Sequence, residues 1–141
     1  MKYLYKVKVN RVKDGDTFEA DVDLGFNACL KDCVFRLYGI NAPETRVNKA
    51  KGITLEEVAK GKESAKIVES IMTTNQSVLI NSIKDSKEKF GRYLAIVYIP
   101  VALWNWGPFS EDNTVIIDNV KYVNLNDYLV AQGYAKAADY D

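Results

Sequence analysis

Histidine is absent from this sequence of 141 residues, and cysteine occurs only twice, at Cys29 and Cys33. Histidine is the commonest general base in enzymes, so any acid–base chemistry must use a carboxylate, Lys, Tyr or metal-bound water. A zinc site of the usual kind is excluded, because two cysteines without histidine cannot complete the ligand set. We therefore expect Cys29 and Cys33 to be free thiols near the start of a strand.

Long apolar runs are missing as well, and none of those present could span a bilayer. The first eight residues alternate polar and apolar side chains, which is not the pattern of a signal sequence. We expect a cytoplasmic protein with no membrane contact; secretion stays open if a leader is removed during maturation. The length favours one domain over residues 1–141, and a hydrophobic content of 48% is typical of globular proteins.

An excess of charge of one sign is lacking too, since 19 basic and 19 acidic residues balance. The balance hides an asymmetry: residues 1–97 hold 17 basic and 13 acidic residues, whereas residues 98–141 hold 2 and 6. A basic face in the first part could attract a polyanion. The alternative is ordinary solvated surface charge, and this feature alone favours that alternative.

Five segments have the alternating or apolar pattern of strands, and they are separated by turn signals. The Asp14-Gly15-Asp16 turn joins the first two into a hairpin, a loop is expected over residues 25–32, and Pro43 ends the third strand. The expected strands span residues 3–12, 17–24, 33–40, 77–83 and 93–99.

A helix is expected between the third and fourth strands. Thr54 and Glu57 form a candidate capping box, and Gly61 is expected to interrupt the helix, leaving residues 62–72 as its firmer part. A short final helix over 125–132 has Asn124 as its N-cap. Five strands with a helix in this position predict an α+β, mainly β fold, a five-stranded OB-fold barrel.

Residues 100–120 read as an insertion between the fifth strand and the final helix. Asp118-Asn119 could turn a small hairpin from residues 114–117 to 121–123. Trp104 and Trp106 in this segment are expected to pack over the barrel, in preference to the alternative that they form a platform for stacking bases.

Two stretches combine carboxylates on turns with an arginine, Asp14–Thr17 and Phe35–Thr45. Oxygen ligands suit a hard cation such as Ca²⁺ or Mg²⁺, and the planar fork of Arg36 suits two phosphate oxygens. Together they are the parts of a metal-assisted phosphodiester hydrolase. Each part alone has a structural alternative: a plain hairpin turn, a strand arginine paired with Asp16 or Glu44, or a loop end at Phe90-Gly91-Arg92.

Five motifs in a fixed order cover nearly the whole chain apart from residues 100–120. On these motifs the chain resembles the staphylococcal nuclease (thermonuclease) family, which are calcium-dependent nucleases built on an OB-fold barrel. The motifs are Asp14-Gly15-Asp16-Thr17, Phe35-Arg36-Leu37, Asn41-Ala42-Pro43-Glu44-Thr45, Lys89-Phe90-Gly91-Arg92 and Leu129-Val130-Ala131-Gln132-Gly133-Tyr134-Ala135.

The resemblance implies a role for each matched residue. Calcium ligands would be Asp16, Asn41, the backbone carbonyl of Ala42, and Glu44, which would also hold the attacking water. Arg36, Glu44 and Arg92 would form the catalytic set, with the two arginines gripping the scissile phosphate. Lys89, Phe90 and Tyr140 would contact the substrate.

Two departures from the family pattern concern the site. Asn41 stands where the family often has an aspartate, which keeps an oxygen ligand but removes a charge. Acidic residues flank Tyr140, where the family pattern has two tyrosines lining the nucleotide pocket.

The resemblance implies a Ca²⁺-dependent endonuclease that hydrolyses DNA and RNA with low sequence specificity. Its products would carry a 3′-phosphate and a 5′-hydroxyl, and single strands would be preferred, because OB surfaces bind splayed backbones. No obligate protein partner is evident. The alternative is a catalytically weak nuclease-like OB module that binds nucleic acid or a protein partner.

Overall fold

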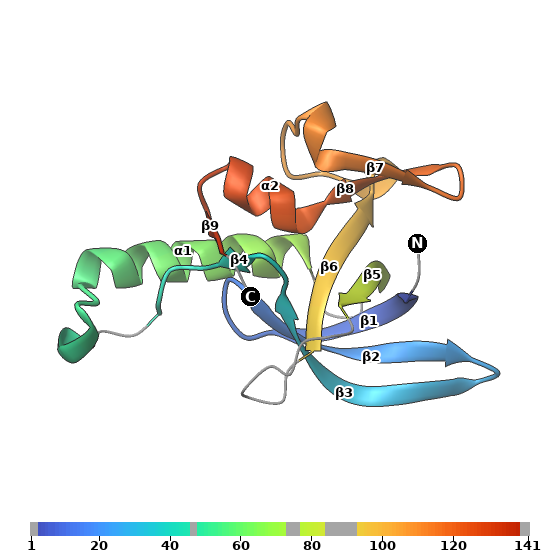
Figure 1. Cartoon of the computed structure of the whole chain (residues 1–141), viewed down its shortest axis with the longest axis horizontal. Helices are drawn as coiled ribbons and strands as arrows, with labels where there is room; N and C mark the ends of the chain where they lie inside the picture. The colour runs from blue at the N-terminus through green and yellow to red at the C-terminus, as the bar shows by residue number, and fades with distance from the viewer. Residues whose placement is uncertain (1–2, 46–47, 73–76, 84–92, 139–141) are drawn as a thin grey trace.

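The alternating segments form strands that close into a barrel, in a computed structural model that describes residues 3–45, 48–72, 77–83 and 93–138 (Figure 1). A parallel pairing of the third and fifth barrel strands closes it, with Phe35 opposite Tyr93 and Leu37 opposite Ala95. The predicted five-stranded OB-type barrel is therefore confirmed. Its strands are β1 (Leu4–Val12), β2 (Thr17–Gly25), β3 (Ala28–Leu37), β5 (Ser77–Ile83) and β6 (Tyr93–Pro100).

The connection between β2 and β3 corrects the sequence prediction. The prediction of a loop over residues 25–32 is wrong, because β3 begins at Ala28 and only Phe26 and Asn27 turn the chain. Both have positive φ, 55° and 61°, the geometry of a two-residue hairpin whose twist matches its strands. Asn adopts this conformation readily, but a bulky Phe does not, so the residue types gave no signal of so tight a turn.

The third strand also ends earlier than expected, at Leu37 and not at Ile40. Gly39 has a φ of 78°, which only glycine adopts without steric cost, and it turns the chain out of the barrel. The chain then forms β4 (Ile40–Asn41), which pairs with β9 (Lys136–Ala137) as a separate two-stranded sheet. This turn places Asn41 outside the barrel wall.

Helix α1 (Leu55–Ile71) follows a short 3-10 turn, η1 (Lys49–Lys51). The Thr54 side chain accepts a hydrogen bond from the Glu57 amide at 3.2 Å, as the capping sequence predicts. The predicted interruption at Gly61 is wrong, because the helix runs through it without a break. The reason for a glycine at this position is a contact with the site, described below.

The core lies inside the barrel, and the C-terminal half of α1 covers it with Val68, Ile71 and Met72, each no more than 1% exposed. The barrel strands contribute apolar residues at alternate positions, as expected for strands with one face buried. The largest fully buried barrel side chains are Phe18, Leu37, Ile80, Ile99, Val7, Val9 and Val97.

The predicted hairpin in the insertion is confirmed as β7 (Thr114–Ile117) and β8 (Val120–Asn124). Asp118 and Asn119 turn it, with φ of 50° and 67°. Strand β8 pairs with β6, so the hairpin extends the barrel sheet outward beyond that strand (Figure 1). Helix α2 (Leu125–Ala131) follows and begins at its predicted N-cap, Asn124. No helix in the described ranges is both long and apolar enough to cross a membrane.

Buried Asn126 on α2 ties this helix to the barrel. Its side-chain oxygen accepts from the Val97 amide at 3.1 Å, and its side-chain nitrogen donates to the Ala95 and Tyr38 carbonyls at 3.1 and 2.9 Å. Three hydrogen bonds at a side chain 3% exposed satisfy the amide and hold the turn after β3 in place. Asn126 is thus a structural residue that supports the start of β4.

The tryptophans of the insertion, Trp104 and Trp106, are half-buried and pack against the core, as expected. The Trp104 ring lies 4.7 Å from that of Tyr128 and 5.3 Å from that of Trp106, both edge to face. The Trp104 indole nitrogen donates to the Gly107 carbonyl at 2.8 Å. The cluster is framed by the 3-10 turns η2 (Val101–Leu103) and η3 (Glu111–Asn113).

Trp104→Ala is expected to lower the free energy of unfolding by about 2 kcal/mol, because it removes these ring contacts from a half-buried side chain. Affinity for single-stranded DNA is expected to stay unchanged. Thermal melts and fluorescence anisotropy with a labelled oligonucleotide measure the two effects. Leu103→Ala, at a neighbouring side chain that is 57% exposed, is the control. Weaker DNA binding at an unchanged melting temperature would indicate base stacking instead.

Candidate active site

Three turns meet at the edge of the barrel where β3 ends. Arg36 is the last but one residue of β3, and its guanidinium donates to the Asn41 side-chain oxygen across the turn to β4. The same guanidinium lies 3.9 Å from a carboxylate oxygen of Asp16, with only 20% of the Arg36 side chain exposed. The ion pair of Arg36 with Asp16, which the sequence offered as a structural alternative to a phosphate site, is therefore present, and it lies within the candidate site.

Asp16 links the first turn to the turn after β4. One of its carboxylate oxygens accepts from the Ala42 amide at 3.0 Å, and the other accepts from the Thr17 hydroxyl at 3.1 Å. The Asp16 carbonyl accepts from the Leu37 amide at 2.8 Å. These bonds bring two segments 26 residues apart into one fixed arrangement.

Asp14 braces the first turn by accepting a hydrogen bond from the Asp16 amide at 3.1 Å. Burial raises the pKa of the Asp14 carboxyl to about 6, and the hydrogen bond and repulsion with the Asp16 side chain act in the same direction. Two carboxylates so close together repel each other, so a positively charged group beside them would be favourable.

Two glycines let these turns lie directly against α1. A Cβ at Gly61 would lie 2.1 Å from the Glu44 carbonyl oxygen, so the helix touches the backbone of the Asn41–Glu44 turn only because Gly61 has no side chain. A Cβ at Gly15 would lie 2.6 Å from the Cβ of Ala42 and 3.2 Å from that of Ser64. The hydroxyl of Ser64 in turn donates to the Tyr134 carbonyl at 2.7 Å.

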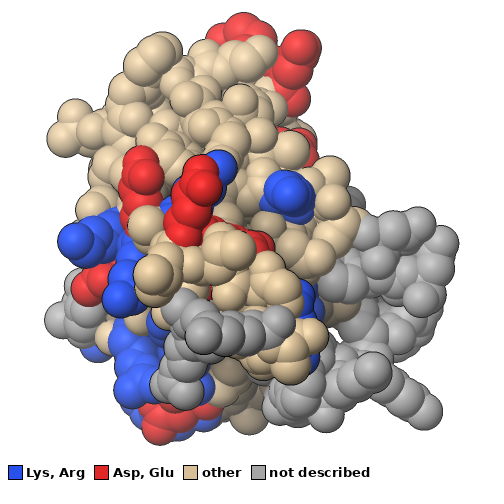
Figure 2. Space-filling model, turned by 90° about the vertical axis from the view of Figure 1, so that its left-hand side faces the viewer, with Lys and Arg blue, Asp and Glu red and all other residues tan. Residues whose placement is uncertain are grey.

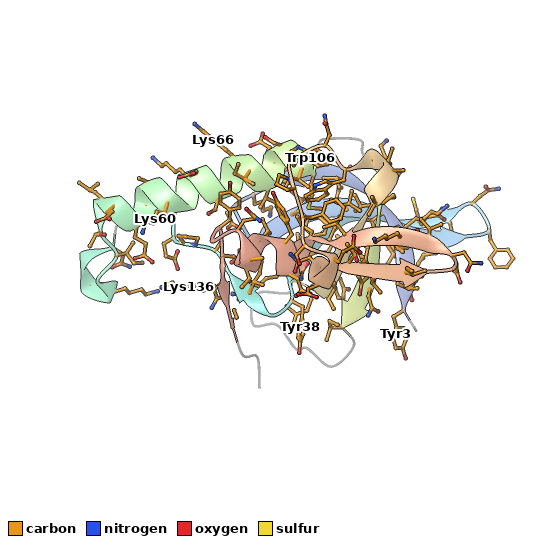
Figure 3. All side chains as sticks on the ribbon, turned by 90° about the horizontal axis from the view of Figure 1, so that it is seen from above. Tyr3, Tyr38, Lys60, Lys66, Trp106 and Lys136 are labelled. Atoms are coloured by element: carbon orange, nitrogen blue, oxygen red, sulfur yellow. The ribbon has the colours of Figure 1, made fainter. Side chains whose placement is uncertain are left out.

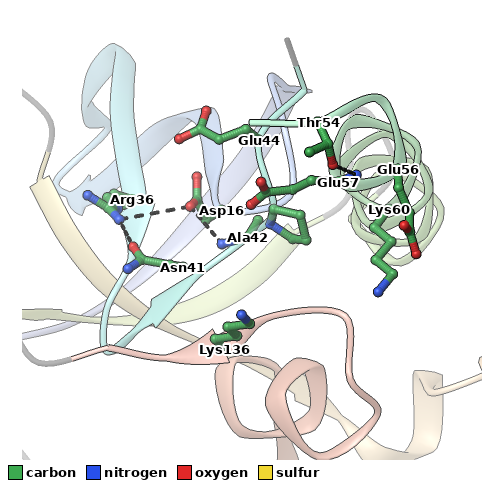
Figure 4. Close-up of a pocket in the computed structure, with 11 residues that line it drawn as sticks. Asp16, Arg36, Asn41, Ala42, Glu44, Thr54, Glu56, Glu57, Lys60 and Lys136 are labelled. Atoms are coloured by element: carbon green, nitrogen blue, oxygen red, sulfur yellow. Dashed lines mark hydrogen bonds and ion pairs between the residues drawn. The ribbon is translucent and has the colours of Figure 1, made fainter. Parts of the chain in front are cut away.

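The turns and the start of α1 enclose an open cavity of about 660 Å³ (Figure 4). The four predicted metal-ligating residues and Arg36 all line it, so the structure brings together every predicted site residue that it describes. Arg92, Lys89, Phe90 and Tyr140 lie outside the described residues. The lining residues are Asp16, Arg36, Asn41, Ala42, Pro43, Glu44, Thr54, Glu56, Glu57, Lys60 and Lys136.

Five lining residues were not anticipated from the sequence: Thr54, Glu56, Glu57, Lys60 and Lys136. The first four belong to the start of α1, which reaches the cavity through the contact at Gly61. Lys136 arrives by the pairing of β9 with β4, in which it stands opposite Asn41. A strand of two residues is too short to show a periodic pattern of polar and apolar residues. The nearest signal in the sequence is the last matched motif, which ends at Ala135, one residue before Lys136.

The cavity is not electropositive by itself. Its described lining contains three basic and four acidic residues, which gives a formal charge of −1. Figure 2 shows the side of the molecule on which α1 begins, where basic side chains gather along one edge and acidic ones lie nearer the middle. A phosphodiester in this cavity would therefore be bound more tightly with a cation beside it.

The oxygen donors fit a weakly held hard cation. Asp16 and Glu44 offer carboxylates, Asn41 an amide oxygen and Ala42 a carbonyl, which are the ligand types that Ca²⁺ accepts. Among the described residues, no group of three or more Asp, Glu, Cys or His side chains could hold a metal. Two carboxylates supplemented by neutral oxygens and water suit the loose end of the calcium range.

A model of the family described as staphylococcal nuclease homologue matches residues 34–141. The match covers the end of β3 with Arg36, the Asn41–Glu44 turn, α1 and the C-terminal motif. No curated protein matches the chain at a significant level.

Proposed function

Because the chain belongs to the staphylococcal nuclease family, we propose that it is a Ca²⁺-dependent phosphodiesterase acting on DNA and RNA. Low sequence specificity is expected because the described lining of the site is rich in charged side chains, which suit the phosphate backbone, and contacts to that backbone carry no sequence information. A preference for single strands follows from an OB barrel, on which a splayed backbone can lie. The products expected from the family resemblance carry a 3′-phosphate and a 5′-hydroxyl.

One observation carries this proposal: Arg36, Asp16 and the Asn41–Glu44 turn face one cavity, although Arg36 lies on β3 and the other two lie on separate turns before and after that strand. If Arg36 and Asp16 formed only a structural ion pair, neither a further carboxylate at Glu44 nor an open cavity beside the pair would be needed. A phosphodiester, a cation and a water molecule together use all of these groups.

The chain's own residues would act as follows. Asp16, Asn41, Ala42 and Glu44 would hold the cation, which supplies Lewis-acid polarisation of a phosphate oxygen when bound. Glu44 holds the attacking water and accepts its proton as the new P–O bond forms. Arg36 donates to phosphate oxygens as their charge grows, and the bond to the 5′ oxygen breaks, with a proton from solvent completing the 5′-hydroxyl.

A second function has one observation in its favour. The Asn41 oxygen already accepts a hydrogen bond from Arg36, and the Asp16 carboxylate already has two donors. Side chains whose hydrogen bonds are already made within the protein suit a structural role. They could belong to a module that binds nucleic acid without cutting it. The presence of Arg36, Glu44 and Arg92 in one chain favours hydrolysis.

Denatured DNA incubated with the protein is expected to be degraded in Ca²⁺, much more slowly in Mg²⁺, and not at all in excess chelator. The reason is geometric: a loop-built site of mixed oxygens suits the irregular shell of Ca²⁺ better than the strict octahedron of Mg²⁺. Gel electrophoresis of end-labelled strands measures the rate and the chemistry of the new ends.

Full activity in Mg²⁺ alone, after Ca²⁺ has been stripped out, would contradict the choice of metal. Binding of the strands in Ca²⁺ without degradation would favour the binding module. A Glu44→Gln sample prepared in parallel excludes a contaminating nuclease, because a contaminant would be insensitive to the substitution.

A further inference from the structure

Lys136 is placed beside the phosphate-binding residues by the pairing of two very short strands. It stands directly opposite Asn41 in the β4–β9 pair, where antiparallel neighbours have Cα atoms about 5 Å apart. Side chains alternate along such a pair, and the next residues, Ile40 and Ala137, line a different cavity on its other side. Lys136 therefore shares with Asn41 the face that looks into the candidate active site.

The arginine and the lysine lie on either side of Asn41. Figure 4 shows Asn41 with Arg36 beyond it in one direction and Lys136 in the other. Arg36 is held by Asn41 and lies near Asp16, and the proposed function assigns it to the scissile phosphate. Lys136 lines the same cavity from the other side of Asn41, so it is placed for a different group of the ligand.

The charge of Lys136 is not used within the described part of the protein. Its side chain is exposed, and it takes part in no hydrogen bond or ion pair there. By contrast, Lys121 pairs with Glu111, and Lys31 pairs with Asp21. A flexible, unpaired ammonium at the rim of a cavity whose described lining is net acidic is available to an anionic ligand.

The cavity of about 660 Å³ is also much larger than one phosphodiester group with its cation. We propose that Lys136 binds the phosphate next to the scissile one, so that the site holds at least two consecutive phosphates of a strand. This inference rests on the proposed function, and it adds to it a binding role for Lys136, a residue outside the predicted site.

A contact of this kind strengthens binding and does not depend on the chemical step. Neutralising one phosphate of a single strand contributes a slope of about 0.7 to the fall of log affinity with log salt. Lys136→Gln is therefore expected to reduce that slope by about 0.7 and to weaken binding by about fivefold at 0.1 M salt.

The probe is a labelled single-stranded oligothymidylate of about eight nucleotides, titrated in Ca²⁺ at several salt concentrations by fluorescence anisotropy. Both arms carry Glu44→Gln, so that the strand stays intact. Lys66→Gln is the matched control, because Lys66 is an exposed residue of α1 that points away from Lys136 (Figure 3). The control is expected to leave affinity and slope at the parent values.

A second measurement separates a neighbouring phosphate from the scissile one. With Glu44 intact, Lys136→Gln is expected to reduce kcat/KM on the oligonucleotide through KM, and to have a markedly smaller effect on a dinucleoside monophosphate, which has no neighbouring phosphate. Equal losses on both substrates, or a loss in kcat alone, would overturn the proposal.

The outcomes keep this inference distinct from the proposed function. If the parent binds the strand and Lys136→Gln changes neither affinity nor slope, the neighbouring-phosphate site is wrong while the nuclease proposal stands. If the parent does not bind the strand in Ca²⁺, the proposed function fails, and this inference fails with it.

Discussion

Arg36→Ala is expected to lower kcat by roughly 10²–10³-fold, because it removes a preorganised donor from the place where charge grows on the phosphate. The guanidinium is already positioned before substrate arrives, by Asn41 and Asp16, so little reorganisation is needed during the reaction. The loss should fall on kcat and kcat/KM alike, since the interaction strengthens in the transition state. Steady-state kinetics in saturating Ca²⁺ measure it.

Two matched variants sharpen this prediction. Arg36→Lys keeps the charge but loses the planar fork, and most of the loss is expected to remain. Arg11→Ala removes an exposed arginine on β1 that pairs with Glu19 at 2.7 Å outside the cavity, and it should leave kcat unchanged. An Arg36→Ala enzyme changed only in KM would show that Arg36 binds ground state and transition state equally.

Gly61→Ala is expected to destabilise the protein by about 2 kcal/mol and to lower kcat by on the order of 10²-fold. In an ordinary helix, alanine is better than glycine by about 1 kcal/mol. Here the added methyl group would lie 2.1 Å from the Glu44 carbonyl oxygen, so either the helix or the Asn41–Glu44 turn must move. If Glu44 acts as proposed, a displacement of about 1 Å is enough for a loss of this size. Thermal melts and kinetics measure the two effects.

The control for Gly61→Ala lies next to it in the same helix. Lys62 is exposed and lines no described cavity, so Lys62→Ala should change stability by no more than about 0.5 kcal/mol and leave kcat unchanged. A Gly61→Ala protein that melts higher than the parent and cuts normally would mean that helix propensity dominates. The contact with Glu44 would then not be needed to position the Asn41–Glu44 turn.

Much of the fold could be predicted from the sequence. The strands over 77–83 and 93–99, the Thr54 and Asn124 caps and the Asp118-Asn119 hairpin depend on local signals, which need only a few neighbouring residues. The predictions that failed have two different causes. The two-residue turn at Phe26-Asn27 contains a bulky residue with positive φ, which its residue type does not favour. The role of Gly61 depends on a non-local contact with a turn 17 positions earlier.

The sequence by itself determined the type of fold and pointed to Asp16, Arg36 and the Asn41–Glu44 turn, because their order and spacing are properties of the chain. Only the tertiary structure decided that these groups share one cavity, that Asp16 bonds the Ala42 amide, and that Lys136 stands opposite Asn41. The physical reason is that such contacts join residues that are distant in sequence. Their geometry depends on barrel closure and on two glycines that allow backbone to approach a helix, and neither can be read from a local pattern.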